Sequence, residues 1–260
     1  MRRSTRLLAI ALPVALATVP VALAGPDSAS GGGEPATSPV PTAVEAAASV
    51  IETARRRATP DTEIVAVQAG AEISLRSRPG GAEALRVGDT TQFGSPQRLG
   101  VVRRQGRWLG VTTPELPNGK LGWVDGRAAG IDVERTRWSI HADVSSRTIV
   151  LRRGGKAVGR LSVAVGRPGS PTPTGRFAVT DKLSGGNYGP YYGCCILAIS
   201  ATQPSTPPGW TGGNRMAIHG TSDPGSIGAA SSAGCLRAAD GDLQVLMRSV
   251  PAGTPVVIRR

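Results

Sequence analysis

The chain has 260 residues and a formal net charge of +12, and its length suggests one or two domains. Its three cysteines are too few for a disulfide-rich scaffold, and their odd number leaves at least one thiol outside any internal pair. Residues 137–260 hold 14 basic and 5 acidic groups, whereas residues 25–136 hold 13 of each. A basic domain suits an anionic partner, but basic and aromatic residues are not interleaved, which argues against nucleic acid.

Residues 1–24 have the pattern of a signal peptide. MRRSTR is a positively charged start, an apolar stretch follows, and Ala-Leu-Ala places small residues before a cleavage point at Gly25. The alternative is an uncleaved membrane anchor, which the two prolines in the apolar stretch disfavour. No other run approaches the ~18 to 20 apolar residues of a membrane span. We therefore expect an exported protein with no transmembrane span in the mature chain.

Residues 25–61 are rich in Pro, Gly, Ser and Ala and predict a linker, in which residues 43–57 are able to form a short helix. From residue 62 to residue 130, short alternating runs separated by turns such as RPGG and PNGK predict a small β-barrel or sandwich. The order of LRSRPG, RWLGV and GWVDG resembles that of bacterial SH3-like domains. Trp108 and Trp123 are candidates for the core or for a binding groove, and the core is favoured.

The second half again reads as short strands. VSSRTIVLRRGGKAVGRL predicts a hairpin with its turn at Arg-Gly-Gly-Lys, and the three prolines in residues 166–177 exclude a central strand there. Residues 183–213 read as a long irregular loop, which in a compact domain is usually functional or disordered. GDLQVLMRSV predicts a helix and TPVVIRR a closing strand. The predicted fold class is therefore mainly β, with a small barrel followed by a β-rich domain that carries a short helix.

The segment IHGTSDPGSIGAASSAGCLR, residues 218–237, holds one of two histidines and one of three cysteines. Cysteine is a good nucleophile only as a thiolate, so it needs a nearby base, and His219 is the candidate close to Cys235 in sequence. Backbone N–H groups near Gly234 and Cys235 would face a developing oxyanion. Arg237 would bind a carboxylate or favour the thiolate.

Other interpretations of these residues remain open. A lone cysteine is more often a small buried hydrophobe, and a lone histidine is more often a structural residue. A zinc site formed by Cys194, Cys195, His219 and Cys235 has enough ligands, but its spacing does not fit the usual pairs separated by a few residues. The adjacent Cys194 and Cys195 have poor geometry for bonding to each other.

The segment AIHGT…SIG…SAGCLR resembles the signature of L,D-transpeptidase catalytic domains of the YkuD type. VGRPGSPTPTGRF is similar to the proline-rich segment of that family, and YYGCCILAISA resembles the region before its lid. The resemblance covers residues 137–260. One departure is Ala233, where many members have histidine, and this puts the details of transition-state contacts in doubt.

The resemblance implies a cysteine acyltransferase that acts on peptidoglycan. Cys235 would attack the amide between the third and fourth residues of a tetrapeptide stem, and His219, oriented by the Gly220 carbonyl, would act as general base. An amine of a second stem would resolve the thioester to give a 3→3 cross-link, with Gly234 contributing its backbone. The implied substrate-contacting residues are Ser232, Tyr188, Tyr191, Tyr192, Trp210 and Arg237.

Three other functions compete with this one. Water instead of an amine would make the protein an L,D-carboxypeptidase, a decayed site would leave a non-catalytic wall-binding protein, and a cysteine peptidase would cut proteins. The resemblance implies no metal or other cofactor. It implies a location in the cell wall or periplasmic space, with stem peptides and anionic wall polymers as partners. A bridge from Cys194 or Cys195 to Cys235 is not expected, because it would silence the nucleophile.

Overall fold

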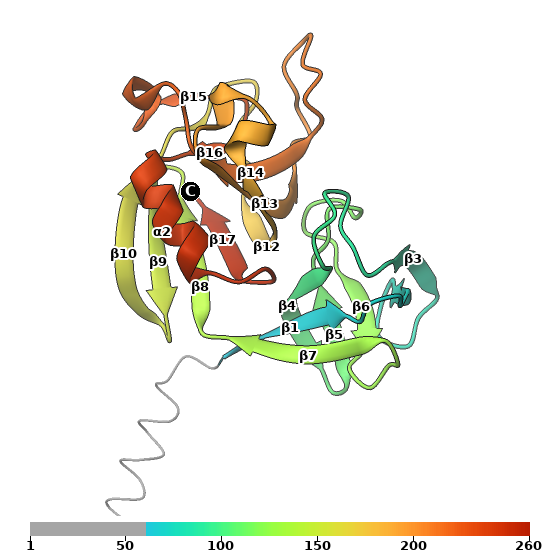
Figure 1. Cartoon of the computed structure of the whole chain (residues 1–260). Coiled ribbons are helices and arrows are strands. Elements are labelled where there is room, and N and C mark those ends of the chain that lie inside the picture. Colours follow the sequence, from blue (N-terminus) through green and yellow to red (C-terminus); the bar gives the residue numbers. More distant parts are fainter. Residues whose placement is uncertain (1–60) are drawn as a thin grey trace, which may run out of the picture. The chain divides into compact units, whose positions relative to one another are not determined.

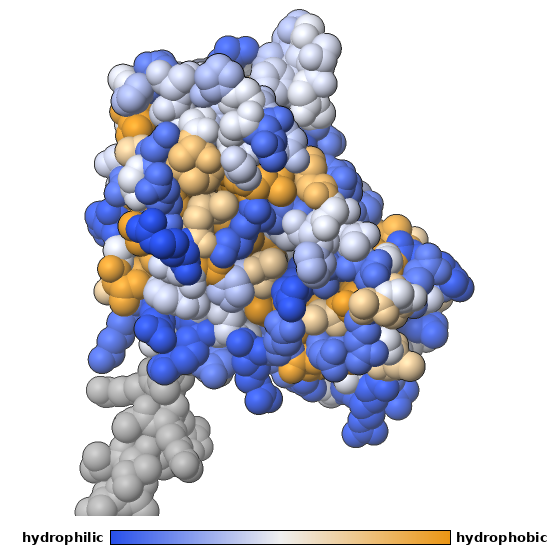
Figure 2. All heavy atoms as spheres, in the orientation of Figure 1, coloured by the Kyte–Doolittle hydropathy of each residue, from blue (hydrophilic) through white to orange (hydrophobic). Residues whose placement is uncertain are grey.

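The computed structural model describes residues 61–260, so the predicted signal peptide and nearly all of the predicted linker, including the helix at 43–57, lie outside the described residues. The described part is mainly β and contains one α-helix, which confirms the predicted fold class (Figure 1). Within it, no helix has the length and apolar character needed to cross a membrane. Hydrophilic side chains cover most of the face drawn in Figure 2, with smaller apolar areas between them.

Seven antiparallel strands form a first sheet in the order β3-β2-β6-β5-β4-β1-β7. Their bounds are β1 (Thr62–Val67), β2 (Ile73–Arg76), β3 (Glu83–Val87), β4 (Arg98–Gln105), β5 (Trp108–Val111), β6 (Gly122–Asp125) and β7 (Ile131–Thr136). Side chains such as Val65, Leu75 and Leu109 form one buried apolar cluster. Trp123 is buried, whereas Trp108 is only half-buried, with two arginine side chains over its ring. The SH3-like character of this sheet stays a prediction.

Eight strands form the second sheet in the order β10-β9-β8-β17-β12-β13-β14-β16. Their bounds are β8 (Trp138–Asp143), β9 (Thr148–Arg153), β10 (Lys156–Ser162), β12 (Gly175–Ser184), β13 (Cys195–Thr202), β14 (Arg215–His219), β16 (Leu236–Arg237) and β17 (Pro255–Arg259). A small separate pair joins β11 (Val165–Gly166) to β15 (Ala230–Ser232). The helices are α2 (Asp240–Ser249) and the 3-10 turns η1 (Gly185–Asn187), η2 (Pro190–Tyr192) and η3 (Pro224–Ser226).

The core of this second part lies between the sheet and α2. Leu243 and Leu246 of α2 are buried in the same apolar cluster as Ile140, Leu197 and Ile218 from three different strands. The predicted helix and closing strand are confirmed as α2 and β17. The predicted hairpin is confirmed as well, because β9 pairs with β10 across a turn whose two glycines have positive φ, as a tight two-residue turn requires.

The prediction of one long irregular loop over residues 183–213 is wrong. Its middle is β13, a strand inside the second sheet, paired with β12 on one side and β14 on the other. The sequence CILAISAT does not alternate because six of its eight residues are buried, so both faces of the strand are covered. A continuous apolar run of this length is consistent with a strand buried on both faces. The Gly, Pro and Tyr residues around it are typical of a loop, and they led to the wrong prediction.

Candidate functional site

Two short parallel strands bring His219 and Cys235 together. His219 is the last residue of β14, Cys235 directly precedes β16, and the register pairs Ile218 with Leu236 and His219 with Arg237. Side chains along a strand alternate between the two faces of the sheet, so Cys235, two residues before Arg237, lies on the face of His219. Strand pairing therefore turns a separation of 16 residues in the sequence into a position on neighbouring strands.

His219 and Cys235 line the same cavity, whose volume is about 170 Å³. The residue Cys235 is partly exposed and carries a free thiol. His219 is fully buried within the protein. Cys235 thus lines the cavity and is not engaged in a disulfide.

The imidazole of His219 has a defined orientation. Its Nδ1 lies 2.6 Å from the Gly220 carbonyl oxygen. A carbonyl only accepts hydrogen bonds, so Nδ1 carries the proton in the neutral ring and Nε2 keeps its lone pair. Nε2 is buried and has no hydrogen-bond partner among the described residues. Burial lowers the pKa of His219 to about 4, with a smaller lowering by the Arg237 charge and an opposing contribution from the Gly220 carbonyl.

The thiol of Cys235 is kept protonated at rest. Burial raises its pKa, and the backbone of Ala217 and the charge of Arg237 oppose that rise only in part. A thiol with a raised pKa and a neutral imidazole thus line the same cavity, and their roles as nucleophile and base stay predictions. This arrangement suits general-base catalysis, in which the base takes the proton during the reaction.

The loop before Cys235 is held by hydrogen bonds of its own. The Gly234 N–H donates to Ser232 Oγ at 3.0 Å, and this hydroxyl donates to the Cys235 carbonyl at 2.6 Å. Ser232 is fully buried and does not line the cavity, so it shapes the loop rather than meeting a ligand directly. The Gly234 N–H already has an acceptor, which leaves the predicted oxyanion contact to the backbone at Cys235.

Two residues that the sequence did not single out brace this loop. Thr172, from the proline-rich segment, donates from Oγ1 to the Gly234 carbonyl at 2.7 Å. Gln203 donates from Nε2 to the Ala233 carbonyl at 3.0 Å, and this amide fills the space that a Cβ at Gly234 would need. The proline-rich segment therefore holds the loop before Cys235 through Thr172, and Gly234 permits the close approach of Gln203.

Four aromatic side chains that the sequence analysis named as substrate-contacting lie around the cavity, and that role stays a prediction. Tyr188, Tyr191, Tyr192 and Trp210 all line the cavity. The ring centroids of Tyr191 and Tyr192 lie 5.6 Å and 4.9 Å from that of His219.

Arg237 faces the aromatic wall. Its Nη2 donates to the Tyr191 hydroxyl at 2.5 Å, and its guanidinium lies 4.8 Å from the centroid of the Tyr191 ring. Arg237 is buried and does not line the cavity. In this structure it positions Tyr191 and contributes positive charge near the thiol, and a direct contact with a ligand carboxylate stays a prediction.

The cavity wall also includes Phe93, which the sequence did not suggest. Phe93 belongs to the loop between β3 and β4 of the first sheet, and its ring centroid lies 6.2 Å from that of Tyr188. Arg215, from β14, lies over the Phe93 ring at 5.5 Å and lines the same cavity. No pattern in the sequence around Phe93 marks it, because its place in the wall arises from contacts between segments distant in the chain.

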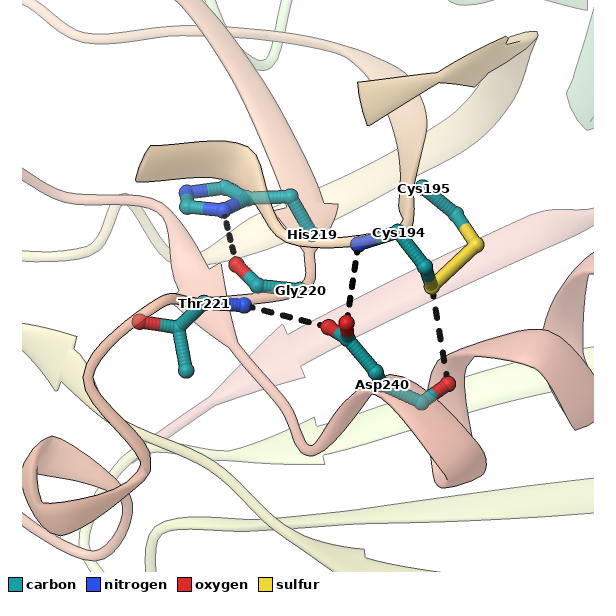
Figure 3. The surroundings of a disulfide bond; sticks show 6 residues. All are labelled: Cys194, Cys195, His219, Gly220, Thr221 and Asp240. Atoms are coloured by element: carbon teal, nitrogen blue, oxygen red, sulfur yellow. Dashed lines mark hydrogen bonds between the residues drawn. A yellow bond between two sulfur atoms is a disulfide. The ribbon is translucent and has the colours of Figure 1, made fainter. Parts of the chain in front are cut away.

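The expectation that Cys194 and Cys195 do not bond to each other is wrong. The structure joins them as a disulfide between adjacent residues at the start of β13, whose first residue is Cys195 (Figure 3). The expectation that neither bonds to Cys235 is confirmed. With these two sulfurs paired, the zinc site loses two of its ligands. The described residues contain no cluster of three or more His, Cys, Asp or Glu side chains arranged to hold a metal ion.

Residues 137–258 match the family YkuD, described as the L,D-transpeptidase catalytic domain. YkuD of Bacillus subtilis, provisionally assigned as an L,D-transpeptidase, is 31% identical over 125 residues, which are 47% of this chain and 66% of that protein, just under two thirds of its length. YqjB of the same organism, with the same assignment, is 35% identical over 112 residues, 40% of this chain and 60% of that protein. The resemblance predicted for the catalytic domain is thereby confirmed.

Among solved structures, an L,D-transpeptidase from Mycobacterium smegmatis is 19% identical, with a TM-score of 0.41, over 78% of this chain and 100% of that chain. The catalytic domain of the Enterococcus faecium enzyme is 23% identical, with a TM-score of 0.34, over 46% of this chain and 95% of that chain.

Proposed function

Because residues 137–258 match the YkuD family, we propose that this protein is a peptidoglycan L,D-transpeptidase that works through a thioester on Cys235. The observation that carries the proposal is the shared cavity of Cys235 and His219, with Nδ1 of the imidazole bound to a carbonyl and Nε2 left to accept a proton. The third member of the usual Ser-His-Asp arrangement is here a backbone group.

The acylation step follows from this geometry. The Cys235 sulfur attacks the carbonyl carbon of the third residue of a tetrapeptide stem, while its proton passes to Nε2 of His219. The carbonyl π electrons move to oxygen, and the backbone at Cys235 stabilises that oxyanion. When the tetrahedral intermediate collapses, the C–N bond breaks and the imidazolium returns its proton to the amine of the departing D-amino acid. A thioester remains on Cys235.

The second step determines the product. An amine from the third residue of another stem attacks the thioester, His219 removes its proton, and the thiol is released, which gives a 3→3 cross-link. If water attacks instead, the product is a shortened stem and the protein is an L,D-carboxypeptidase. The aromatic wall and the low polarity of the cavity support the amine, because they restrict water around the thioester.

The other parts of the chain have proposed roles in export of the protein and in its placement at the cell wall. We assign residues 1–24 to a signal peptide, 25–61 to a linker, 62–130 to an SH3-like module that contacts the wall, and 137–260 to the catalytic domain. These assignments make the protein extracytoplasmic, with stem peptides as substrates. Anionic wall polymers are proposed as further partners because of the excess of basic groups after residue 136.

Two measurements test the proposal. Incubation with a carbapenem should add the mass of one drug molecule to the intact protein, at Cys235, and absence of an adduct would favour a non-catalytic wall-binding protein. Tetrapeptide-bearing muropeptides should yield a cross-linked dimer and free D-amino acid. A shortened monomer without dimer would identify a carboxypeptidase, and cleavage of a protein substrate with no action on muropeptides would indicate a peptidase.

A further inference from the structure

An acidic side chain lies one peptide group away from His219. Asp240 is the first residue of α2, and its Oδ1 accepts the Thr221 N–H at 3.3 Å while its Oδ2 accepts the Cys194 N–H at 3.0 Å (Figure 3). Figure 3 shows the carboxylate between the backbone at Thr221 and the backbone at Cys194, which belongs to the disulfide. The Cys194 sulfur also lies 3.5 Å from the Asp240 carbonyl oxygen, and since a disulfide sulfur has no hydrogen, this is a contact only.

The Thr221 N–H and the Gly220 carbonyl belong to the same peptide group. In a trans peptide, the C=O and the N–H point in opposite directions in one rigid plane. The carbonyl accepts from His219 Nδ1, and the N–H on the opposite side donates to Asp240. A carboxylate that holds the N–H therefore also fixes the direction of the carbonyl, and it polarises the peptide so that the carbonyl becomes a better acceptor.

Two glycines make room for this carboxylate. A Cβ placed at Gly220 or at Gly193 would collide with Oδ1 of Asp240. Gly193 also has a φ of 58°, a backbone conformation that side chains other than glycine rarely adopt. Gly220, after His219, and Gly193, before the paired cysteines, are thus required for the same reason. Each leaves space for the Asp240 carboxylate.

We propose that Asp240 is a positioning residue for His219, acting through the Gly220–Thr221 peptide. In a Ser-His-Asp triad the carboxylate contacts the imidazole directly. Here the Gly220–Thr221 peptide group lies between the Asp240 carboxylate and the His219 imidazole. Asp240 keeps the imidazole in the tautomer with Nε2 unprotonated, and its negative charge favours the imidazolium that forms during acylation. This inference rests on the proposed function for its effect on rate, but not for its effect on the imidazole.

The test compares two variants of the same helix turn. Asp240→Asn removes the charge and leaves one side-chain oxygen for two N–H donors, so the amide NH2 faces either the Thr221 N–H or the Cys194 N–H. Asp242→Asn removes the same charge from the same first turn of α2, but Asp242 is exposed. We expect Asp240→Asn to slow acylation by a carbapenem about 10-fold or more, and Asp242→Asn to slow it less than about 2-fold. Equal rates in both variants would overturn the proposal.

A second readout does not need catalysis. The chain has two histidines, so ring NMR signals are assigned by the loss of one in His141→Gln. The charged or titratable groups that share the cavity of His219 or influence its pKa are Cys235, Tyr188, Tyr191, Tyr192, Arg215 and Arg237, and none of them changes in either variant. The pKa of His219 should fall in Asp240→Asn and stay constant in Asp242→Asn. An unchanged pKa would overturn the proposal even if the protein proved to lack transpeptidase activity.

The unmodified protein provides a third measurement, which decides the question should Asp240→Asn fail to fold. The Thr221 amide proton should be protected from exchange with solvent, because it donates to the Asp240 carboxylate. A Thr221 amide that exchanges freely would remove Asp240 from contact with the peptide.

Discussion

The two histidines of this chain lie on the same sheet in opposite environments. His219, at the end of β14, is fully buried, bonded to a backbone carbonyl and covered by two tyrosine rings. His141, on β8, is half-buried beside an open groove, with its Nε2 3.0 Å from the Ser139 hydroxyl. In both, burial is the main cause that lowers the pKa, and arginine charges lower it further.

Because both pKa values are lowered, the direction of the shift does not distinguish the two histidines. What sets His219 apart is a fixed tautomer, a free Nε2 and a thiol in the same cavity. Around His141 the neighbours are Arg152 and Arg259, and no cysteine lines its groove.

The largest effect is expected from the thiol. Cys235→Ala should abolish the covalent adduct with a carbapenem and all cross-linking, because no other free thiol is present among the described residues. Intact-protein mass spectrometry checks the adduct, and muropeptide analysis checks the cross-link. An adduct that persists in Cys235→Ala would move the nucleophile elsewhere.

The base should matter next. His219→Gln should slow acylation by ~10²-fold or more, because the thiol loses its proton acceptor. The matched control is His141→Gln, which should leave the rate within about 2-fold of the unmodified protein. Stopped-flow measurement of the acylation rate checks both, and similar rates for the two variants would end the distinction between the histidines.

Stability should also depend on pH through His219. Its pKa is lowered from 6.5 to about 4 in the folded protein, so between these values the unfolded chain binds more protons, and stability falls as pH drops. The loss should be complete near pH 4 and amount to about 3 kcal/mol.

Urea unfolding at pH 7 and pH 4 measures this contribution. His219→Gln should lose less stability than the unmodified protein over that interval, by about 3 kcal/mol, because glutamine does not titrate. In His141→Gln the difference should have the same sign but be smaller, since His141 is only half-buried. If the unmodified protein and His219→Gln lost the same free energy of unfolding between pH 7 and pH 4, the conclusion that His219 is buried and neutral would be wrong.

The smallest effect concerns the aromatic cover. Tyr192→Leu removes the ring whose centroid lies nearest to that of His219 and should admit water to the imidazole. The pKa of His219 should then rise toward 6.5, while that of His141 stays constant, as followed by the two ring NMR signals. If the pKa of His219 did not change in Tyr192→Leu, its desolvation would come from the packing of the strands and not from the tyrosine rings.

The sequence alone predicted much of the candidate site. A His-Gly and a Ser-x-Gly-Cys-x-Arg pattern, 16 residues apart in a chain with few of either reactive residue, indicated the thiol and its base. It also predicted the mainly β class, the hairpin, the final helix and the closing strand, because alternation, glycine turns and helical periodicity are local properties. It did not predict β13, whose apolar run has no period when both faces are buried.

Only the tertiary structure decided which distant groups meet at the site. Strand register put His219 and Cys235 on one face, loop packing added Phe93, and the start of α2 brought Asp240 to the peptide behind the histidine. The pairing of Cys194 with Cys195 likewise went against the local expectation. Residue types and spacings determine which chemistry is available, but contacts between segments far apart in the chain depend on how the sheets and the helix pack, and no local pattern encodes that packing.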